Sequence, residues 1–247
     1  METDYSFVKL EFKKEYNEST NYLTHNFHSY PAKFIPQIPK TTINLLTKEK
    51  DVVLDPFCGC GTTLVEAKLL NRNAIGIDLN QVAVLVSKSK TTKLDTHQIN
   101  RIPNLLNEIK LDINNYYSSK ATNIKYKIPS FNNINHWFQE NVLNELAIIK
   151  TYINKLFDKT LKNYLYTAFS SIIVSVSNQE SDTRFASINK DIKPYRTFFE
   201  FCKKINDMNK RILEFSNTAS NSEINIYQAD SQNLNFLNDD SVDHIVT

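Results

Sequence analysis

Glycine and cysteine are both scarce in this chain: each occurs three times in 247 residues. Three cysteines, an odd number, exclude a complete disulfide framework and fit a reducing compartment. No run of 18 apolar residues occurs, which excludes a membrane-spanning helix, and Met1–Asp4 do not read as the start of a signal peptide. We therefore expect a cytoplasmic protein with no membrane partner.

An excess of charge of one sign is lacking too. The net charge is +2, so the chain as a whole has no strong electrostatic demand for a polyanion. Lysine clusters at residues 88–93 and 120–127 are expected to be solvated faces, with a nucleic-acid contact as the alternative. Hydrophobic residues make up 41% of the chain and charged residues 23%, which is ordinary for a globular domain with a real core.

The three glycines, Gly59, Gly61 and Gly76, all lie in one stretch. Glycine permits positive φ and close approach of a ligand to the backbone. Apolar runs predict short buried strands at residues 52–54 and 74–77, with a helix from Thr62 to Asn71 between them. This β-α-β pattern predicts an α/β, Rossmann-like parallel sheet whose glycine loop is shaped around a ligand.

The chemistry of the ligand follows from the same stretch. The helix starting near Thr62 offers unpaired backbone N–H groups beside the loop. Asp78 closes the second strand, where an acid accepts hydrogen bonds from ribose hydroxyls in nucleoside-binding sheets. An adenosine-containing cofactor is predicted. A nicotinamide dehydrogenase is the weaker alternative, because Leu64 stands where the dinucleotide fingerprint has a third glycine or alanine.

Residues 55–63, with the sequence DPFCGCGTT, resemble the cofactor motif of the DNA methyltransferases that act on cytosine N4 or adenine N6. Residues 75–78, IGID, look like the ribose-binding motif of the same family. The resemblance implies S-adenosyl-L-methionine (AdoMet) as cofactor, double-stranded DNA as partner, and a place in a restriction-modification system. A small-molecule or RNA methyltransferase is a further alternative, disfavoured because small-molecule enzymes more often carry a glycine-richer loop.

Two flanking segments extend the resemblance. Residues 28–36, HSYPAKFIP, look like the motif that closes over the methionine end of AdoMet. Residues 224–231, INIYQADS, look like the strand whose final acid bonds the adenine amino group. The cofactor-binding residues that the resemblance implies are Tyr30, Pro31, Ala32, Lys33, Phe34, Asp55, Pro56, Phe57, Gly59, Gly61, Thr62, Thr63, Asp78, Leu79, Asp230 and Ser231.

The family's catalytic motif, Ser/Asp/Asn-Pro-Pro-Tyr/Phe/Trp, occurs nowhere in the sequence, so no catalytic residue is assigned. Residues 240–247 are predicted to form a fourth strand, which in the family leads into that motif. The chain is then a subunit of a split enzyme, a truncated product, or a non-catalytic AdoMet-binding or DNA-binding regulatory protein. Resembling strands that end in Val-Thr tend to continue with Ser-Pro-Pro-Tyr, which favours cytosine N4 over adenine N6.

The sheet expected from this order is incomplete, with an exposed edge at the fourth strand. We expect a second polypeptide, or self-association, to cover that edge.

Three parts are predicted along the chain. Residues 1–95 hold the N-terminal loop and first β-α-β unit, residues 96–221 a helical insertion, and residues 222–247 the return to the sheet. Apolar spacing over residues 137–156 predicts an amphipathic core helix, followed by helices at 161–176 and 198–215. A polar loop is predicted at residues 177–184.

The insertion carries the candidate DNA contacts. Arg184 and Arg196 are predicted to bind phosphates. Cys58 and Cys60 have no second Cys/His pair nearby, so no metal site is expected.

Overall fold

A computed structural model describes residues 19–247. The chain divides into two compact units: residues 94–210 form the second, and residues 1–93 with 211–247 the first. The first 18 residues of the predicted N-terminal part, Met1–Asp4 among them, lie outside the described residues. The predicted boundaries at residues 95 and 221 stay a prediction.

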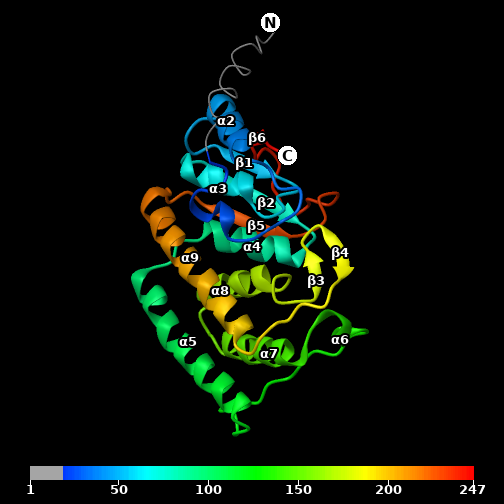
Figure 1. The fold of residues 1–247 in the computed structure, drawn as a ribbon. Coiled ribbons are helices and arrows are strands. Elements are labelled where there is room, and N and C mark those ends of the chain that lie inside the picture. Colours follow the sequence, from blue (N-terminus) through cyan, green and yellow to red (C-terminus); the bar gives the residue numbers. More distant parts are fainter. Residues whose placement is uncertain (1–18) are drawn as a thin grey trace, which may run out of the picture. The chain divides into compact units, whose positions relative to one another are not determined.

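The first unit is built on a parallel sheet (Figure 1). Its strands are β1 (Val52–Asp55), β2 (Asn73–Asp78), β5 (Ile224–Gln228) and β6 (His244–Ile245), in the order β5-β2-β1-β6. Every pairing in this sheet is parallel, and β2 aligns with β5 from Ala74↔Ile224 to Asp78↔Gln228. The α/β, Rossmann-like fold class is confirmed.

Helices accompany these strands in chain order. They are the 3-10 helix η1 (Leu23–Asn26), α2 (Gln37–Leu46), α3 (Thr62–Leu69) and α4 (Gln81–Thr91). The helices and strands share one apolar core, in which almost every element contributes a buried side chain. Its members are Ile43, Val53, Cys58, Leu64, Ala67, Ala74, Val84, Ile226 and Val246.

The last strand is shorter than the predicted span of 240–247. Only His244 and Ile245 pair with β1 as a ladder, at Val53 and Leu54. Asp240 interrupts an extended backbone because it takes a left-handed φ of 55°. Asp243 joins Val52 twice: its carboxylate accepts a 2.7 Å hydrogen bond from the Val52 N–H, and its own N–H donates to the Val52 carbonyl at 3.0 Å.

The second unit is mostly helical. It holds α5 (Thr96–Tyr117), α6 (Ile134–Trp137), α7 (Glu140–Asn154), α8 (Lys159–Ile172) and the first part of α9 (Arg196–Thr218), which continues into the first unit. The predicted polar loop at residues 177–184 is wrong in part. Two antiparallel strands, β3 (Gln179–Ser181) and β4 (Arg184–Ser187), form a hairpin there.

The predicted amphipathic helix over residues 137–156 forms as α7, and its apolar stripe is core as expected. Val142, Leu146, Ile149 and Ile153 are buried. The helix begins only at Glu140, because Phe138 has extended backbone angles and ends the short α6 before it. The predicted hydrophobic spacing is therefore confirmed, but the helix begins three residues later than predicted.

Across residues 19–247, no helix combines the length and apolarity needed to cross a bilayer. Over the same residues, no group of three or more His, Cys, Asp or Glu side chains is placed to hold a metal ion.

Candidate cofactor-binding site

The loop between β1 and α3 depends on Gly61. This residue caps α3 with φ 75°, in the left-handed region, and a Cβ there would lie 2.9 Å from Ser87 Cβ and 3.1 Å from Ser87 Cα. Both conformation and space therefore require glycine. Gly59 also has positive φ, 49°, and its carbonyl accepts a 2.7 Å hydrogen bond from Ser87 Oγ. Helix α4 thus fixes the path of the loop.

Gly76 has a different role from the other two glycines. A Cβ at this position would lie 2.4 Å from Leu64 Cδ1 and 3.1 Å from Cys58 Sγ. Glycine here allows α3 and the loop to pack closely on β2. Gly76, which lies in the predicted second strand, therefore serves packing, whereas Gly59 and Gly61 shape the loop.

Asp78, the predicted ribose-binding acid, lies beside the glycine loop. Its Oδ2 accepts a 2.9 Å hydrogen bond from Gly59 N–H, and its Oδ1 accepts a 2.8 Å bond from Asn80 N–H. Asn80 in turn caps α4 through Val82 N–H and reaches the Tyr30 hydroxyl at 3.5 Å. The ends of β1 and β2 and the N-terminal segment therefore meet at one place.

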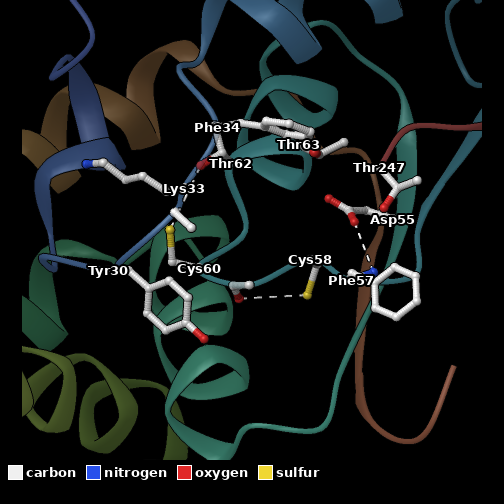
Figure 2. Close-up of a pocket in the computed structure, with 12 residues that line it drawn as sticks. Tyr30, Lys33, Phe34, Asp55, Phe57, Cys58, Cys60, Thr62, Thr63 and Thr247 are labelled. Carbon is white, nitrogen blue, oxygen red and sulfur yellow. Dashed lines mark hydrogen bonds between the residues drawn. The ribbon is translucent and has the colours of Figure 1, made fainter.

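A cavity of about 140 Å³ opens beside this loop (Figure 2). Nine of the predicted cofactor-binding residues line it: Tyr30, Ala32, Lys33, Phe34, Asp55, Phe57, Gly59, Thr62 and Thr63. Cys58, Cys60 and Thr247 line it as well and were not predicted as ligand contacts. The cysteines bracket Gly59 in the motif, which was a usable signal, whereas nothing in the sequence marked Thr247.

Seven predicted residues do not line the cavity: Pro31, Pro56, Gly61, Asp78, Leu79, Asp230 and Ser231. The turn after β5 nevertheless lies against the loops after β1 and β2. Ser231 Oγ donates to the Pro56 carbonyl, and Ala229 N–H donates to the Asp78 carbonyl at 3.3 Å. These residues therefore adjoin the cavity, and their contact with a ligand stays a prediction.

Asp55 is the buried acid of the cavity. Its side chain, on a residue only 3% exposed, accepts a 3.2 Å hydrogen bond from Phe57 N–H. Burial raises the pKa of Asp55 to about 6, and the negative charge of Asp78 acts in the same direction. Burial also raises the pKa of the Cys58 thiol to about 12, so Cys58 is a small, unreactive loop residue.

Opposite Asp55, Figure 2 shows Cys60, Thr62 and Lys33 on the other side of the cavity. Cys60 Sγ lies 3.9 Å from Thr62 Oγ1, at the first residue of α3. The Lys33 ammonium points away from the cavity in this view and donates to the His25 carbonyl at 3.5 Å. The cavity therefore has an acidic side and a side formed by the start of a helix.

A buried polar cluster behind this side was not predicted. Glu66 of α3 accepts 2.6 Å hydrogen bonds from the Tyr22 hydroxyl and from His25 Nε2. Burial, followed by the charges of Lys90 and Lys33, lowers the pKa of His25 well below its ordinary value, so the imidazole is neutral and donates through Nε2. The cluster ties η1 to α3. Its sequence signal was a glutamate inside an otherwise buried helical run.

Lys90 corrects the prediction that residues 88–93 form a solvated face. Lys88 is exposed as expected, but Lys90 is only 1% exposed. Its ammonium donates to Cys60 Sγ at 3.6 Å, and its carbonyl accepts a 2.9 Å bond from Thr24 Oγ1. Lysine runs on a helix usually point to solvent, and only the structure shows that Lys90 turns inward.

Arg184 and Arg196 lie in the second unit, and both are exposed. Arg184 forms a 3.0 Å ion pair with Glu180, and Arg196 a 2.6 Å pair with Glu200. A phosphate would have to compete with these carboxylates. Their role as DNA contacts stays a prediction.

Residues 6–89 match the family model described as DNA methylase. This match includes the N-terminal segment, the glycine loop and most of α4. The cofactor motif, identified in the sequence by its resemblance to this family, therefore falls inside the matched segment.

Curated relatives of the chain are methyltransferases that act on DNA or on tRNA. The chain is 34% identical over 183 residues to the type II methyltransferase M.MvaI of Kocuria varians, which covers 73% of this chain and 38% of that protein. It is 27% identical over 203 residues to M.BsoBI of Geobacillus stearothermophilus, covering 81% and 36%. A tRNA (guanine(10)-N2)-dimethyltransferase of Methanocaldococcus jannaschii is 30% identical over 118 residues, covering 42% and 33%.

The chain spans less than two fifths of the length of each of these relatives. The enzymes of the matched family use AdoMet. In its cofactor-loop segment and in its alignments with M.MvaI and M.BsoBI, the chain resembles the site-specific DNA amino-methyltransferases.

Proposed function

We propose that this chain binds AdoMet as the cofactor-binding part of a DNA methyltransferase acting on an exocyclic amino group, cytosine N4 in preference to adenine N6. The observation that carries the proposal is the cavity at the carboxyl end of β1. There, a glycine loop, a buried Asp55 and the start of α3 face a common space. Ligands of parallel α/β sheets bind at this end of the strands.

The residues present fit this cofactor. AdoMet carries an ammonium and a sulfonium, and Asp55 is a buried acid whose pKa burial has raised to about 6, so a nearby cation would favour its charged form. Tyr30, Phe34 and Phe57 supply apolar walls for the methionine side chain. Asp78 and Asp230 are proposed to hold the ribose and adenine. Bound AdoMet supplies an electrophilic methyl group.

The groups that prepare the acceptor nitrogen are proposed to lie outside residues 1–247. An exocyclic amino group is a weak nucleophile, so its base must be extruded and its amino hydrogens accepted by positioned polar groups. Support comes from Thr247, which follows β6 and lines the cavity beside Asp55, so polypeptide continuing from this strand would enter the site. Sequencing the native locus past the Thr247 codon tests this proposal. An in-frame or separately started Ser-Pro-Pro-Tyr is expected.

The partner that completes the site is proposed to be either a continuation of this chain or a second polypeptide pairing with β6. Ile245 in this strand is 57% exposed, which gives an incoming strand an apolar position to cover. Incubating the 247-residue chain with labelled AdoMet and DNA is expected to transfer no methyl group. Addition of a polypeptide carrying the tetrapeptide is expected to start transfer, and transfer by the chain alone contradicts this proposal.

DNA contacts are proposed at Arg184 and Arg196. Because each arginine is already paired with a glutamate, a modest contribution to DNA affinity is expected, about 2-fold to 5-fold per residue. Reversing both charges tests this by filter binding at fixed salt, with the exposed Lys150 reversed as a control. Unchanged DNA affinity in the double variant removes these residues from the proposal.

A non-catalytic AdoMet-binding or DNA-binding regulatory protein is the second candidate. Calorimetric titration with AdoMet and with NAD⁺ separates the cofactor classes: AdoMet binding with no NAD⁺ binding is expected. The chain together with the polypeptide that carries the tetrapeptide is expected to methylate DNA and not tRNA. Transfer to DNA excludes a regulator, and the lack of transfer to tRNA excludes an RNA methyltransferase. If the chain binds no AdoMet, both the methyltransferase proposal and the AdoMet-binding regulator are wrong.

A further inference from the structure

Lys90 is a buried cation that contacts a residue lining the cavity. It lies near the end of α4, is 1% exposed, and carries an ammonium with three hydrogens to donate. Among residues 19–247, the hydrogen-bond acceptor that it reaches is the Cys60 thiol, at 3.6 Å. A thiol is a weak acceptor, so the ammonium is poorly solvated by the protein.

The fold alone does not account for this arrangement. Burial lowers the pKa of Lys90, which means that keeping the group charged costs folding free energy; Cys60 and Glu66 offset part of that cost. Glu66 itself already accepts two hydrogen bonds from Tyr22 and His25. An uncharged side chain of similar length would fill the same space without this cost.

The charge of Lys90 faces one particular side of the cavity. Cys60, which the ammonium contacts, lines the cavity next to Thr62, where α3 begins without a side-chain cap. The positive end of a helix and the Lys90 charge therefore act on the same space. Asp55 lies on the opposite side. The cavity is polarised, positive at Cys60 and Thr62 and negative at Asp55.

We propose that Lys90 is a positioning residue that, acting through Cys60, holds the carboxylate of the cofactor's methionine end at the start of α3. This inference rests on the proposed function, because it requires AdoMet to occupy the cavity. The amino-acid end of AdoMet is a zwitterion, and its two charges match the two sides of the cavity. Its ammonium lies toward Asp55 and its carboxylate toward Cys60 and Thr62.

The test compares AdoMet with decarboxylated AdoMet, which lacks only the carboxylate, by calorimetric titration of the full chain. Lys90→Met is expected to lower AdoMet affinity about 10-fold while leaving the affinity for decarboxylated AdoMet within 2-fold. The melting temperature of the free variant is expected to rise, since a buried charge is removed. Lys88→Met, at an exposed lysine of the same helix, is the matched control and is expected to change neither affinity.

Each other outcome has a distinct meaning. If the wild-type chain does not bind AdoMet, the proposed function fails. If wild type binds and Lys90→Met binds AdoMet equally well, or loses both ligands to the same extent, the inference fails alone. Lys90→Gln repeats the test with a polar side chain. Failure of both variants to fold also overturns the inference, because it makes the charge a requirement of the fold.

Discussion

Two buried carboxylates, one in each unit, differ in how completely the protein satisfies them. Glu145 of α7 is fully buried and accepts hydrogen bonds from the Tyr117 hydroxyl at 2.6 Å, Tyr195 N–H at 2.7 Å and Phe198 N–H at 2.9 Å. Asp55 accepts a longer bond, 3.2 Å, from Phe57 N–H, and burial raises its pKa to about 6.

The difference separates a structural acid from a site acid. Glu145 joins α5 and α7 to the start of α9 and has little capacity left for a ligand. Asp55 and Lys90, both near the cavity, have only weak hydrogen-bond partners. A ligand can bring the opposite charge that each of them lacks. Buried charge therefore stabilises the fold at Glu145 and costs stability at Asp55 and Lys90.

The largest effect is expected at Glu145. Glu145→Gln places an NH₂ group among three donors and removes the charge, so the free energy of unfolding is expected to fall by roughly 3 kcal/mol. Urea denaturation followed by circular dichroism measures this. Glu140→Gln, at an exposed position of the same helix, is the control and is expected to stay within about 0.5 kcal/mol. If Glu145→Gln and Glu140→Gln changed the unfolding free energy equally, Glu145 would not be a structural acid and its contrast with Asp55 would fail.

The next effect is expected at Gly61. Gly61→Ala combines a left-handed φ with a Cβ 2.9 Å from Ser87, so unfolding free energy is expected to fall by roughly 2–4 kcal/mol and AdoMet binding to be lost. At Gly59, whose added Cβ would meet Tyr30 at 3.5 Å, the same change is expected to cost only about 1 kcal/mol. Thermal denaturation and titration of both variants check the order. Reversed effects would mean that the loop is held differently.

A smaller effect of opposite sign is expected at Asp55. Asp55→Asn removes a buried charge, and unfolding free energy at pH 8 is expected to rise by about 1–3 kcal/mol. AdoMet affinity is expected to fall at least 10-fold, because the cationic ligand loses its counter-charge. Denaturation and titration of the same preparation measure both. A variant that loses stability as well as affinity would place Asp55 with Glu145 among the structural acids.

The smallest effect is a pH dependence of the wild type. The folded-state pKa of Asp55, about 6, lies above the ordinary 3.8, so its contribution to stability is complete below about pH 4 and is lost as pH rises through about 6. AdoMet affinity should change in the reverse direction and fall as pH drops below about 6, where Asp55 is protonated. Titrations from pH 5 to 8 measure this. Asp55→Asn is expected to flatten the profile, and an identical slope in the variant would assign it to another group.

The sheet unit was predictable where short-range chemistry decides the structure. Apolar runs before Asp55 and Asp78 predict β1 and β2. The glycines between them predict the tight turn that leads into α3, because Gly61 can take the left-handed φ that this turn needs. The packing role of Gly76 could not be predicted, because it depends on a contact with Leu64, twelve residues away, which local pattern does not show.

Long-range burial explains the other differences. Lys90 looks like a solvated lysine in a cluster, and only the packing of α4 against η1 and the loop buries it. The β3–β4 hairpin has polar side chains on both strands, so no alternation of polar and apolar residues predicts it. The hairpin is defined instead by strand pairing, such as that of Gln179 with Ser187. Tyr22, His25 and Glu66 meet across more than 40 positions of sequence.

A crystal structure of the chain with AdoMet tests the central claim most directly. The account predicts the methionine end in the cavity lined by Asp55, Cys60 and Thr62, with its ammonium toward Asp55 and its carboxylate toward Cys60, and the ribose beside Asp78. AdoMet bound elsewhere, or bound here with the ammonium toward Cys60, would contradict it.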